Sequence, residues 1–414
     1  MRLLVGVLVA LGFAPQALAL GKLPGNAYEA HTLLASNAEL GADKLEPALK
    51  NAWGLTVKKD VAGTRMLVGV VGGVYRYLGD VTTSQDVQTQ VLGTDAFRKI
   101  DVPAGGQDRI VSTITASSSK EQFVSTYTLP GGAAFTTTAN LLFAGTGGVI
   151  SAWAERRSGD SRFDFPAAAV PVIDHSAAGA QYFSMALNVA QDRLYATNFG
   201  KAPGIQVFDG QFQPVWMEFD QPFDYDNNGG ITPGELAPYS LLSYRLPNGE
   251  PRLLVGFAKT KRCDDWFKAK LLCKDGEMVP GRIDDKDAYL GAIAEFTEDG
   301  KVVTTWRDTG VELKGPSSMV FAPAGFGALA GALLVSNFVS GSIAAFDPKT
   351  RAFIDYLRDA DGEVLRVEKP RGLVFGDGVT AGGDNTLYVV SAAGEQWDGM
   401  LVRITPTTPA DKAH

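Results

Sequence analysis

The sequence predicts an all-β fold, a six-bladed β-propeller whose blades are four-stranded antiparallel sheets. The main observation is an internal repeat: RLYATNFGKAPGIQVFD at residues 193–209 returns as ALLVSNFVSGSIAAFD at residues 332–347. Each copy has an apolar run, a polar break at an asparagine, a glycine and a strand that ends in Phe-Asp, which is the pattern of a β-hairpin. A short apolar strand precedes each copy and another follows it, so each unit supplies the four strands of a propeller blade.

Two further observations support this fold class. The phrases WGL, SSMVF and RGLVF, and others of their kind, open successive units and give a count of six blades. The 47 glycines and 21 prolines suit many short strands joined by tight turns, and 45% hydrophobic residues are ample for a buried interior. Because a repeat architecture can absorb 414 residues without a second core, we expect a single domain.

The N-terminus has the pattern of a secretory signal peptide over residues 1–19. Met1-Arg2 is followed by an apolar run from Leu3 to Phe13 and by the small-x-small sequence Ala17-Leu18-Ala19. The alternative is a membrane anchor, but this run is too short to span a bilayer. We therefore expect the protein to be exported, to the periplasm or outside the cell, with no membrane span.

Residues 20–50 form a lead-in to the first blade. The stretch AELGADKLEPALK within it is rich in alanine and leucine and predicts a short helix or another ordered segment. Propellers usually close by letting an N-terminal segment complete the last sheet, which removes an exposed edge. The lead-in is the candidate for that closing segment.

The propeller is predicted over residues 51–405. NAWGLTV opens the first blade, the second lies at about residues 108–155, and the first copy of the repeat forms the third. The fourth begins near Tyr239 and holds an insertion at about residues 258–285, the fifth ends near Leu357, and the sixth starts at PRGLVFGDG. Residues 406–414 are expected to be a flexible tail.

The two cysteines of the chain, Cys263 and Cys273, both lie in the insertion of the fourth blade. In an oxidising compartment they are expected to form a disulfide. The alternative is a metal site, but two thiols with no histidine nearby are a poor zinc set.

The net charge argues against nucleic-acid binding. Lysine and arginine number 38 against 46 aspartate and glutamate residues, a formal charge of −8, and no basic run stands out. We interpret the net negative charge as a feature that keeps the protein soluble rather than one that steers a cationic partner to it. We expect a monomer whose loop face binds an unknown ligand or protein.

The chain resembles a family of secreted bacterial proteins of unassigned function, some of which carry a C-terminal PEP-CTERM sorting tail. The resemblance rests on NAWGL, ATNFG followed by IQVFD, DHSAAG, PAGFGALAGALLVSNF, GSIAAFDP, YLRDADG, RGLVFGDG and AGGDNTLY. It implies a six-bladed propeller akin to NHL-repeat and lactonase-type propellers, and it supplies no catalytic residues. This chain departs from the family in lacking the sorting tail, in a glycine-poor stretch between His31 and Asn51, and in the cysteine-bearing insertion.

The strongest local signal is DYDNNGGITPGE at residues 224–235, which has the spacing of an EF-hand-like Ca²⁺ loop. Gly229 provides the sharp turn, and Thr232 to Glu235 has the pattern of a helix start. The alternative is a surface turn that binds no metal. The predicted ligands are Asp224, Asp226, Asn228, the carbonyl of Gly230, Thr232 and Glu235.

No sequence pattern for hydrolytic chemistry is present: there is no G-x-S-x-G, HExxH or Walker loop. One enzymatic alternative is a metal-dependent hydrolase of the lactonase type, in which a divalent ion in the central channel polarises a carbonyl. The channel candidates, from the first strand of each blade, are Asn51, Ser184, Ser317 and Arg371, and no carboxylate is among them. The repeat asparagines, Asn198 and Asn337, are interpreted as turn formers.

The function predicted from the sequence is therefore that of an exported, calcium-stabilised propeller that acts as a binding or interaction module. Catalysis is the less favoured possibility.

Overall fold

The computed structural model of the chain describes residues 22–407 with internal gaps. The gaps are residues 61–62, 78–98, 107–108, 158–162, 263–277, 281–290, 307–312, 380 and 395–397. Cys263 and Cys273 lie outside the described residues. No helix in the described part of the chain is long and apolar enough to cross a lipid bilayer.

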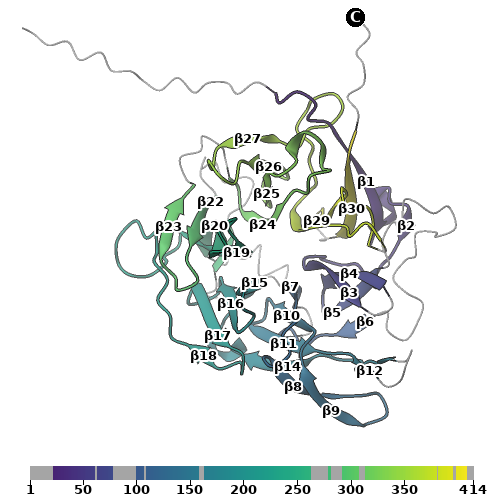
Figure 1. Ribbon diagram of the computed structural model, residues 1–414, viewed down its shortest axis with the longest axis vertical. Coiled ribbons are helices and arrows are strands. Elements are labelled where there is room, and N and C mark those ends of the chain that lie inside the picture. The colour runs from purple at the N-terminus through teal and green to yellow at the C-terminus, as the bar shows by residue number, and fades with distance from the viewer. Residues whose placement is uncertain are drawn as a thin grey trace, which may run out of the picture.

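Six sheets form a ring of blades around a central axis (Figure 1). The first blade consists of β3 (Leu55–Asp60), β4 (Gly63–Val70), β5 (Gly73–Tyr77) and β6 (Lys99–Asp101). The second consists of β7 (Val111–Ala116), β10 (Leu141–Gly145), β11 (Val149–Trp153) and β14 (Val170–Asp174). The third consists of β15 (Tyr182–Leu187), β16 (Arg193–Asn198), β17 (Gly204–Asp209) and β18 (Pro214–Val215).

The remaining blades follow the same order from the axis outwards. The fourth consists of β19 (Leu236–Arg245), β20 (Pro251–Arg262), β22 (Gly291–Phe296) and β23 (Val302–Thr305), and β21 (Met278–Pro280) pairs with the end of β20. The fifth consists of β24 (Pro316–Phe321), β25 (Leu333–Asn337), β26 (Ile343–Phe346) and β27 (Phe353–Tyr356). The sixth consists of β28 (Pro370–Phe375), β29 (Leu387–Ala393), β30 (Asp398–Pro406), β1 (Tyr28–Ala35) and β2 (Lys44–Leu45).

The predicted fold class is confirmed: the chain is an all-β, six-bladed propeller. Two short hairpins lie outside the blades, β8 (Val124–Thr128) with β9 (Ala134–Thr138), and β12 (Arg156–Arg157) with β13 (Phe163–Asp164). The first of these follows β7 and lies on the rim of the ring (Figure 1). Its Tyr127 is fully buried against the second and third blades, so the hairpin is part of the body of the protein.

The N-terminal segment supplies the strand beyond β30 in the sixth blade. β1 pairs antiparallel with β30, from Tyr28 opposite Pro406 to Ala35 opposite Met400. The helix predicted in this segment is reduced to one 3₁₀ turn, η1 (Ala38–Leu40), because Gly41 adopts a left-handed conformation (φ 64) that ends it. The first strand of the chain thus lies beside the last, and the ring is closed by hydrogen bonds between the two ends.

Two buried carboxylates fasten this closure. Asp398 on β30 accepts hydrogen bonds from Ser36 (3.0 Å) and Asn37 (3.2 Å) and forms an ion pair with Lys50. Burial alone would raise the pKa of Asp398, but the bonds from Lys50, Asn37 and Ser36 outweigh it and hold the pKa below its usual value. Each of these partners belongs to the N-terminal segment, so Asp398 joins the two ends of the chain.

The second carboxylate, Asp355 on β27, holds the residues before β1. Its carboxylate accepts from the backbone N–H of Leu23 (3.0 Å) and from the Asn26 side chain (2.8 Å), and Arg358 pairs with it at 2.8 Å. These contacts tie the segment that precedes β1 to the fifth blade. The N-terminal segment is therefore held by two neighbouring blades.

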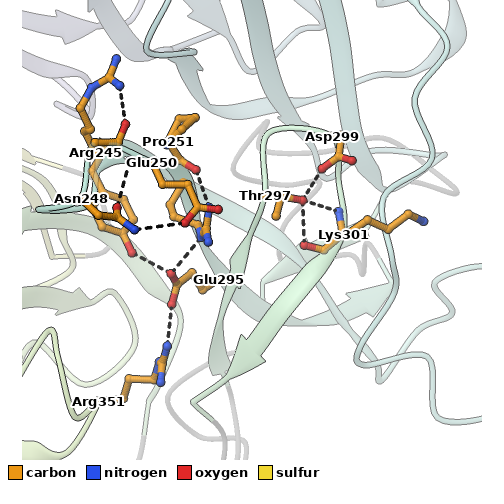
Figure 2. A network of polar contacts seen from close by, with 12 residues as sticks. Arg245, Asn248, Glu250, Pro251, Glu295, Thr297, Asp299, Lys301 and Arg351 are labelled. Atoms are coloured by element: carbon orange, nitrogen blue, oxygen red, sulfur yellow. Dashed lines mark hydrogen bonds and ion pairs between the residues drawn. The ribbon is translucent and has the colours of Figure 1, made fainter.

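The core lies between the blades, because each sheet packs its apolar faces against its neighbours. Between the fourth and fifth blades, buried Leu254 and Ile293 pack against Leu333 and Val335. Beside them lies a buried ion-pair network centred on Glu295 of β22 (Figure 2). It joins the two blades by polar contacts as well.

In this network the carboxylate of Glu295 accepts a hydrogen bond from Tyr244 Oη at 3.0 Å. It pairs with Arg252 Nε at 3.5 Å and with Arg351 Nη2 at 3.2 Å, and Arg351 comes from the turn between β26 and β27 of the fifth blade. Burial and the neighbouring Glu295 carboxylate raise the pKa of Tyr244, so the phenol remains a hydrogen-bond donor at neutral pH.

Candidate functional site: the axial cavity and the acidic loop

The innermost strands of the six blades surround a cavity of about 480 Å³ at the axis. These strands are β3, β7, β15, β19, β24 and β28, and each contributes residues to the wall. The lining includes Thr56, Ser112 to Ala116, Phe183 to Leu187, Ser240 to Ser243, Ser317, Ser318 and Arg371. Three of the four predicted channel residues, Ser184, Ser317 and Arg371, therefore line one cavity, and Asn51 lies next to it.

Aromatic side chains close the axis at the beginning of these strands. The ring centroid of Trp53 lies 4.9 Å from that of Phe183, and the Tyr239 centroid lies 5.3 Å from Phe183 and 5.5 Å from Phe199. Phe338 stacks parallel to Trp53 at 6.4 Å. We call these five residues the aromatic plug; Trp53 and Phe183 also line the cavity and form its floor.

The internal repeat explains two members of the plug. Phe199 and Phe338 follow Asn198 and Asn337 in the two copies of the repeat, so the same position of the third and fifth blades reaches the axis. Sequence reasoning missed this role, although the Asn-Phe pair that the two copies share was a visible signal. The repeat therefore specifies the closure of the channel as well as a strand pattern.

The repeat asparagines take part in the turns, because Asn198 Oδ1 accepts from the Gly200 N–H at 3.0 Å and Asn337 Nδ2 donates to Ser342 Oγ at 3.2 Å, but this is not their whole role. Both end a strand, and neither has a positive φ. Asn198 Oδ1 accepts from the backbone N–H of Gln181 at 2.9 Å, and Asn337 Oδ1 accepts from that of Lys314 at 3.0 Å. Each asparagine thus holds the entrance of the inner strand of its own blade, because its amide replaces a missing strand partner.

Arg371 lies within the plug. Its guanidinium carbon stands 3.9 Å from the ring centroid of Trp53, a cation–π contact, and Nη1 donates to Asn51 Oδ1 at 2.5 Å and to the Ala52 carbonyl at 3.3 Å. Burial lowers the pKa of Arg371 to about 9, so the group is still a cation at neutral pH. Arg371 and Asn51 together fasten the sixth blade to the first.

The serines of the inner strands fasten the other blades. Ser317 Oγ donates to the Pro370 carbonyl at 2.7 Å, and Ser184 Oγ accepts from the Leu241 N–H at 3.0 Å. Ser240 Oγ donates to the Pro316 carbonyl at 2.7 Å. Each of these bonds crosses from one blade to the next, so the channel positions serve first as links between blades.

The cavity does not have the ligand set of a divalent-ion site. Among the described residues that line it, none is an aspartate or a glutamate. Hard cations in proteins are held mainly by carboxylate oxygens together with carbonyls and water. The described wall offers hydroxyls, the amides of Asn188 and Gln191, strand backbone and one arginine.

The carboxylates come together elsewhere, in the loop between β18 and β19. One oxygen from each of Asp224, Asp226 and Glu235 lies within 4.8 Å of the other two. The Asp224 carboxylate accepts from the backbone N–H groups of Asn228 (3.3 Å) and Gly229 (2.9 Å), and Gly229 turns the chain with φ 79. The loop wraps around its first aspartate, so its acidic side chains converge.

Glu235 is the buried end of this loop. It accepts from the backbone N–H groups of Tyr225 (2.7 Å) and Thr232 (2.8 Å) and from Thr232 Oγ1 (3.0 Å). Burial would raise the pKa of Glu235, but these hydrogen bonds lower it below its usual value. The last predicted ligand is therefore an anion held close to the first residues of the loop, as a cation site requires.

The helix start predicted at Thr232 to Glu235 is wrong: the segment is a turn that leads directly into β19. The reason is the neighbouring strand. Thr260 of β20 donates its N–H to the Glu235 carbonyl at 2.8 Å and accepts from the Gly234 N–H at 3.0 Å. Strand pairing uses the backbone groups that a helix would have used. The sheet, and not the local capping pattern, therefore determines the conformation of this segment.

No family model matches the chain. It is 26% identical over 208 residues to an uncharacterised protein of Acanthamoeba polyphaga mimivirus, and this match covers 50% of the chain and 34% of that protein. The chain thus matches about a third of the length of this relative.

Several solved structures are similar in fold. A hydrazine synthase of Kuenenia stuttgartiensis has a TM-score of 0.41 and 12% identity, covering 83% of this chain and 77% of that one. A gluconolactonase of Xanthomonas campestris has a TM-score of 0.35 and 14% identity, with 70% and 88% covered. A β-propeller domain of Myceliophteria thermophila has a TM-score of 0.39 and 10% identity, with 86% and 84% covered.

Proposed function

We propose that this chain is an exported, calcium-stabilised β-propeller that acts as a binding module and takes its ligand in the axial cavity. One observation carries the proposal: six inner strands surround a cavity of about 480 Å³ whose described wall holds polar groups but no carboxylate. A concave site of this size with an apolar floor and a few placed polar groups is what a small ligand requires. The sequence pattern of a signal peptide over residues 1–19 supports export.

A metal-dependent hydrolase of the lactonase type would need a divalent ion in this cavity, held by carboxylates and amides from several blades. The inner-strand serines instead bond to the neighbouring blades, and no carboxylate is among the described residues of the wall. The described residues of the cavity therefore favour binding over metal-assisted hydrolysis.

The binding proposal is tested with a small-molecule screen and a variant that fills the cavity. Thr56 of β3 is half-buried in the wall, and Thr56→Trp would place a large ring in the cavity. We expect at least one metabolite to raise the melting temperature of the protein and to leave that of Thr56→Trp unchanged, with no turnover of the metabolite. A ligand that is consumed, or one that stabilises both proteins equally, would argue against the proposal.

The calcium part of the proposal is that the acidic loop at residues 224–235 binds one Ca²⁺ and braces the start of β19. Asp224, Asp226 and Glu235 supply three carboxylates, and Asn228, Thr232 and the Gly230 carbonyl supply the neutral oxygens of an EF-hand-like site. Glu235 is followed directly by β19, whose residues Ser240 to Ser243 line the cavity. Calcium would therefore stabilise an inner strand.

Chelation is expected to lower the melting temperature. A lone loop that binds with a Kd of about 10⁻⁴ to 10⁻³ M would gain about 1.4 to 2.7 kcal/mol of stability at roughly 10 mM Ca²⁺. Calorimetry with Ca²⁺ and with chelator measures this difference, which Asp224→Ala should abolish. Asp361→Ala, at an exposed aspartate in another turn, is the matched control and should keep it. Equal melting with and without chelator would remove calcium from the proposal.

A further inference from the structure

The backbone of the inner strands gives the cavity both hydrogen-bond donors and acceptors. An inner strand has a partner on one side only, so alternate N–H and C=O groups point away from that partner and towards the axis. Some of these groups bond to the next blade, as the Gly54 N–H does to the Val111 carbonyl at 3.1 Å. The backbone groups that such bonds do not use add neutral donors and acceptors to the wall.

The hydroxyls of the wall are held in fixed orientations. Thr113 Oγ1 donates to the Phe183 carbonyl at 3.1 Å, and Thr115 Oγ1 donates to the Met185 carbonyl at 3.0 Å. A hydroxyl whose proton is already committed still has lone pairs that can accept from a ligand. These threonines are half-buried and line the cavity, so they present preorganised acceptors.

Charge is nearly absent from the wall. Arg371 is the single ionisable residue among the described residues that line the cavity, and it is only 1% exposed. Its guanidinium lies against Trp53 and bonds to Asn51, so a ligand does not meet an open charge there. A charged ligand would lose its hydration in this cavity and gain no opposite charge in return, which is costly.

The floor of the cavity is aromatic. Trp53 and Phe183 are 6% and 8% exposed, and both line the cavity. Arg371 lies over the Trp53 ring, so the small exposed part of this floor offers apolar contact to the C–H groups of a ring-shaped ligand, while the hydroxyls and strand edges of the wall suit its polar rim. The cavity therefore has an apolar base and a neutral, hydrogen-bonding wall.

From these features we infer that the axial cavity binds a neutral carbohydrate of one or two rings. Each hydroxyl of such a ligand both donates and accepts, which matches a wall of alternating N–H and C=O groups with hydroxyl acceptors. A volume of about 480 Å³ lies within the range of small-ligand sites. The inference rests on the proposed binding function and specifies its ligand class.

The test is isothermal titration calorimetry of the calcium-loaded protein with glucose, galactose, maltose and lactose, and with the charged analogues glucuronate, galacturonate and glucosamine. Two variants fill the cavity from different blades: Thr56→Trp on β3 and Ser243→Trp on β19. Thr128→Trp is the matched control, since Thr128 is exposed on the rim hairpin. The melting temperature of each variant shows whether it is folded.

We expect at least one neutral sugar to bind the parent protein and Thr128→Trp with Kd values within about twofold of each other. Binding to a folded cavity-filling variant, and binding of the charged analogues to the parent protein, should be weaker by about tenfold or more. If only one of the two cavity-filling variants folds, that variant alone tests whether the sugar binds in the cavity. If neither folds, saturation-transfer NMR on the parent protein decides, and transfer from indole protons of Trp53 to the sugar is the expected result.

Three outcomes would overturn the inference, and they separate it from the proposed function. Charged analogues that bind as tightly as the neutral sugars would contradict a neutral ligand, and sugar binding that survives both filled variants would place the sugar elsewhere. If no sugar binds but the metabolite screen yields a ligand that Thr56→Trp excludes, the ligand class is wrong and the binding module stands. If neither experiment yields a ligand, both proposals fail.

Discussion

A chain that begins at residue 37, and therefore lacks β1, is expected not to form the closed ring. β1 supplies the antiparallel partner of β30 along its length, and it buries Tyr28, Leu33 and Leu34 almost completely. Burial of each of these side chains stabilises the fold by about 1.5 to 3 kcal/mol, and the total stability of a domain is only about 5 to 15 kcal/mol. The deletion should remove the cooperative melting transition in calorimetry.

The deletion has two further consequences. The edge of β30 would be exposed, so the truncated protein should aggregate, which light scattering detects. It would also lose the contacts of Leu23 and Asn26 with Asp355 and those of Ser36 with Asp398. A synthetic peptide of residues 22–37 added in trans should restore part of the transition.

Two controls define this result. A chain that begins at residue 22 keeps β1 and should melt like a chain that begins at residue 20. Leu34→Ala should keep a cooperative transition at a cost of about 2 to 5 kcal/mol, because it leaves a cavity without removing the strand. A truncated protein that melts cooperatively within about 5 °C of the full chain would show that β1 is dispensable.

The contrast between β1 and the blades shows what the sequence could predict. The blades were predictable because their signals are local: an apolar run, a turn residue and an alternating strand recur at residues 193–209 and 332–347. β1 has the sequence YEAHTLLA, without a regular alternation, and its partner β30 lies at the other end of the chain. The lead-in was predicted as the closing segment from the way propellers usually close, but the bounds of its strand were not, because a partner at the other end of the chain decides its conformation.

The same reasoning applies to the site. The spacing of Asp224, Asp226 and Glu235 is a local signal, and the structure brings these three carboxylates together. The positions of Ser184 and Ser317 at the axis could be predicted, because both residues lie near the start of an inner strand. Their bonds to the neighbouring blades could not be predicted. Contacts between blades join residues far apart in the sequence, as Ser317 and Pro370 are, so no pattern within one blade predicts them.

The second large effect is expected for Glu295→Ala, at the centre of the ion-pair network between the fourth and fifth blades (Figure 2). The Glu295 side chain is 5% exposed and that of Arg252 is 11% exposed, so the substitution leaves a largely buried cation with only the half-exposed Glu250 carboxylate, at 2.8 Å, as its ion-pair partner. Breaking a buried ion pair by removing one partner costs about 3 to 5 kcal/mol. Denaturant unfolding should show this loss at neutral pH.

Two variants separate the charge from the shape of the side chain. Glu295→Gln keeps an acceptor for Tyr244 but removes the charge that Arg252 and Arg351 face, so its cost should lie between those of wild type and Glu295→Ala. Asp299→Ala, on the same hairpin but exposed, is the matched control and should change the free energy of unfolding by no more than about 0.5 kcal/mol.

A double-mutant cycle with Arg351→Ala then measures the link between the blades. Arg351 is 38% exposed and comes from the fifth blade, so its coupling to Glu295 should be weaker than that of Arg252 but still above the roughly 0.2 to 1 kcal/mol of a surface pair. A coupling near zero would mean that Glu295 stabilises only its own blade. Apolar packing of Leu254 and Ile293 against Leu333 and Val335 would then hold the two blades together without help from the ion pair.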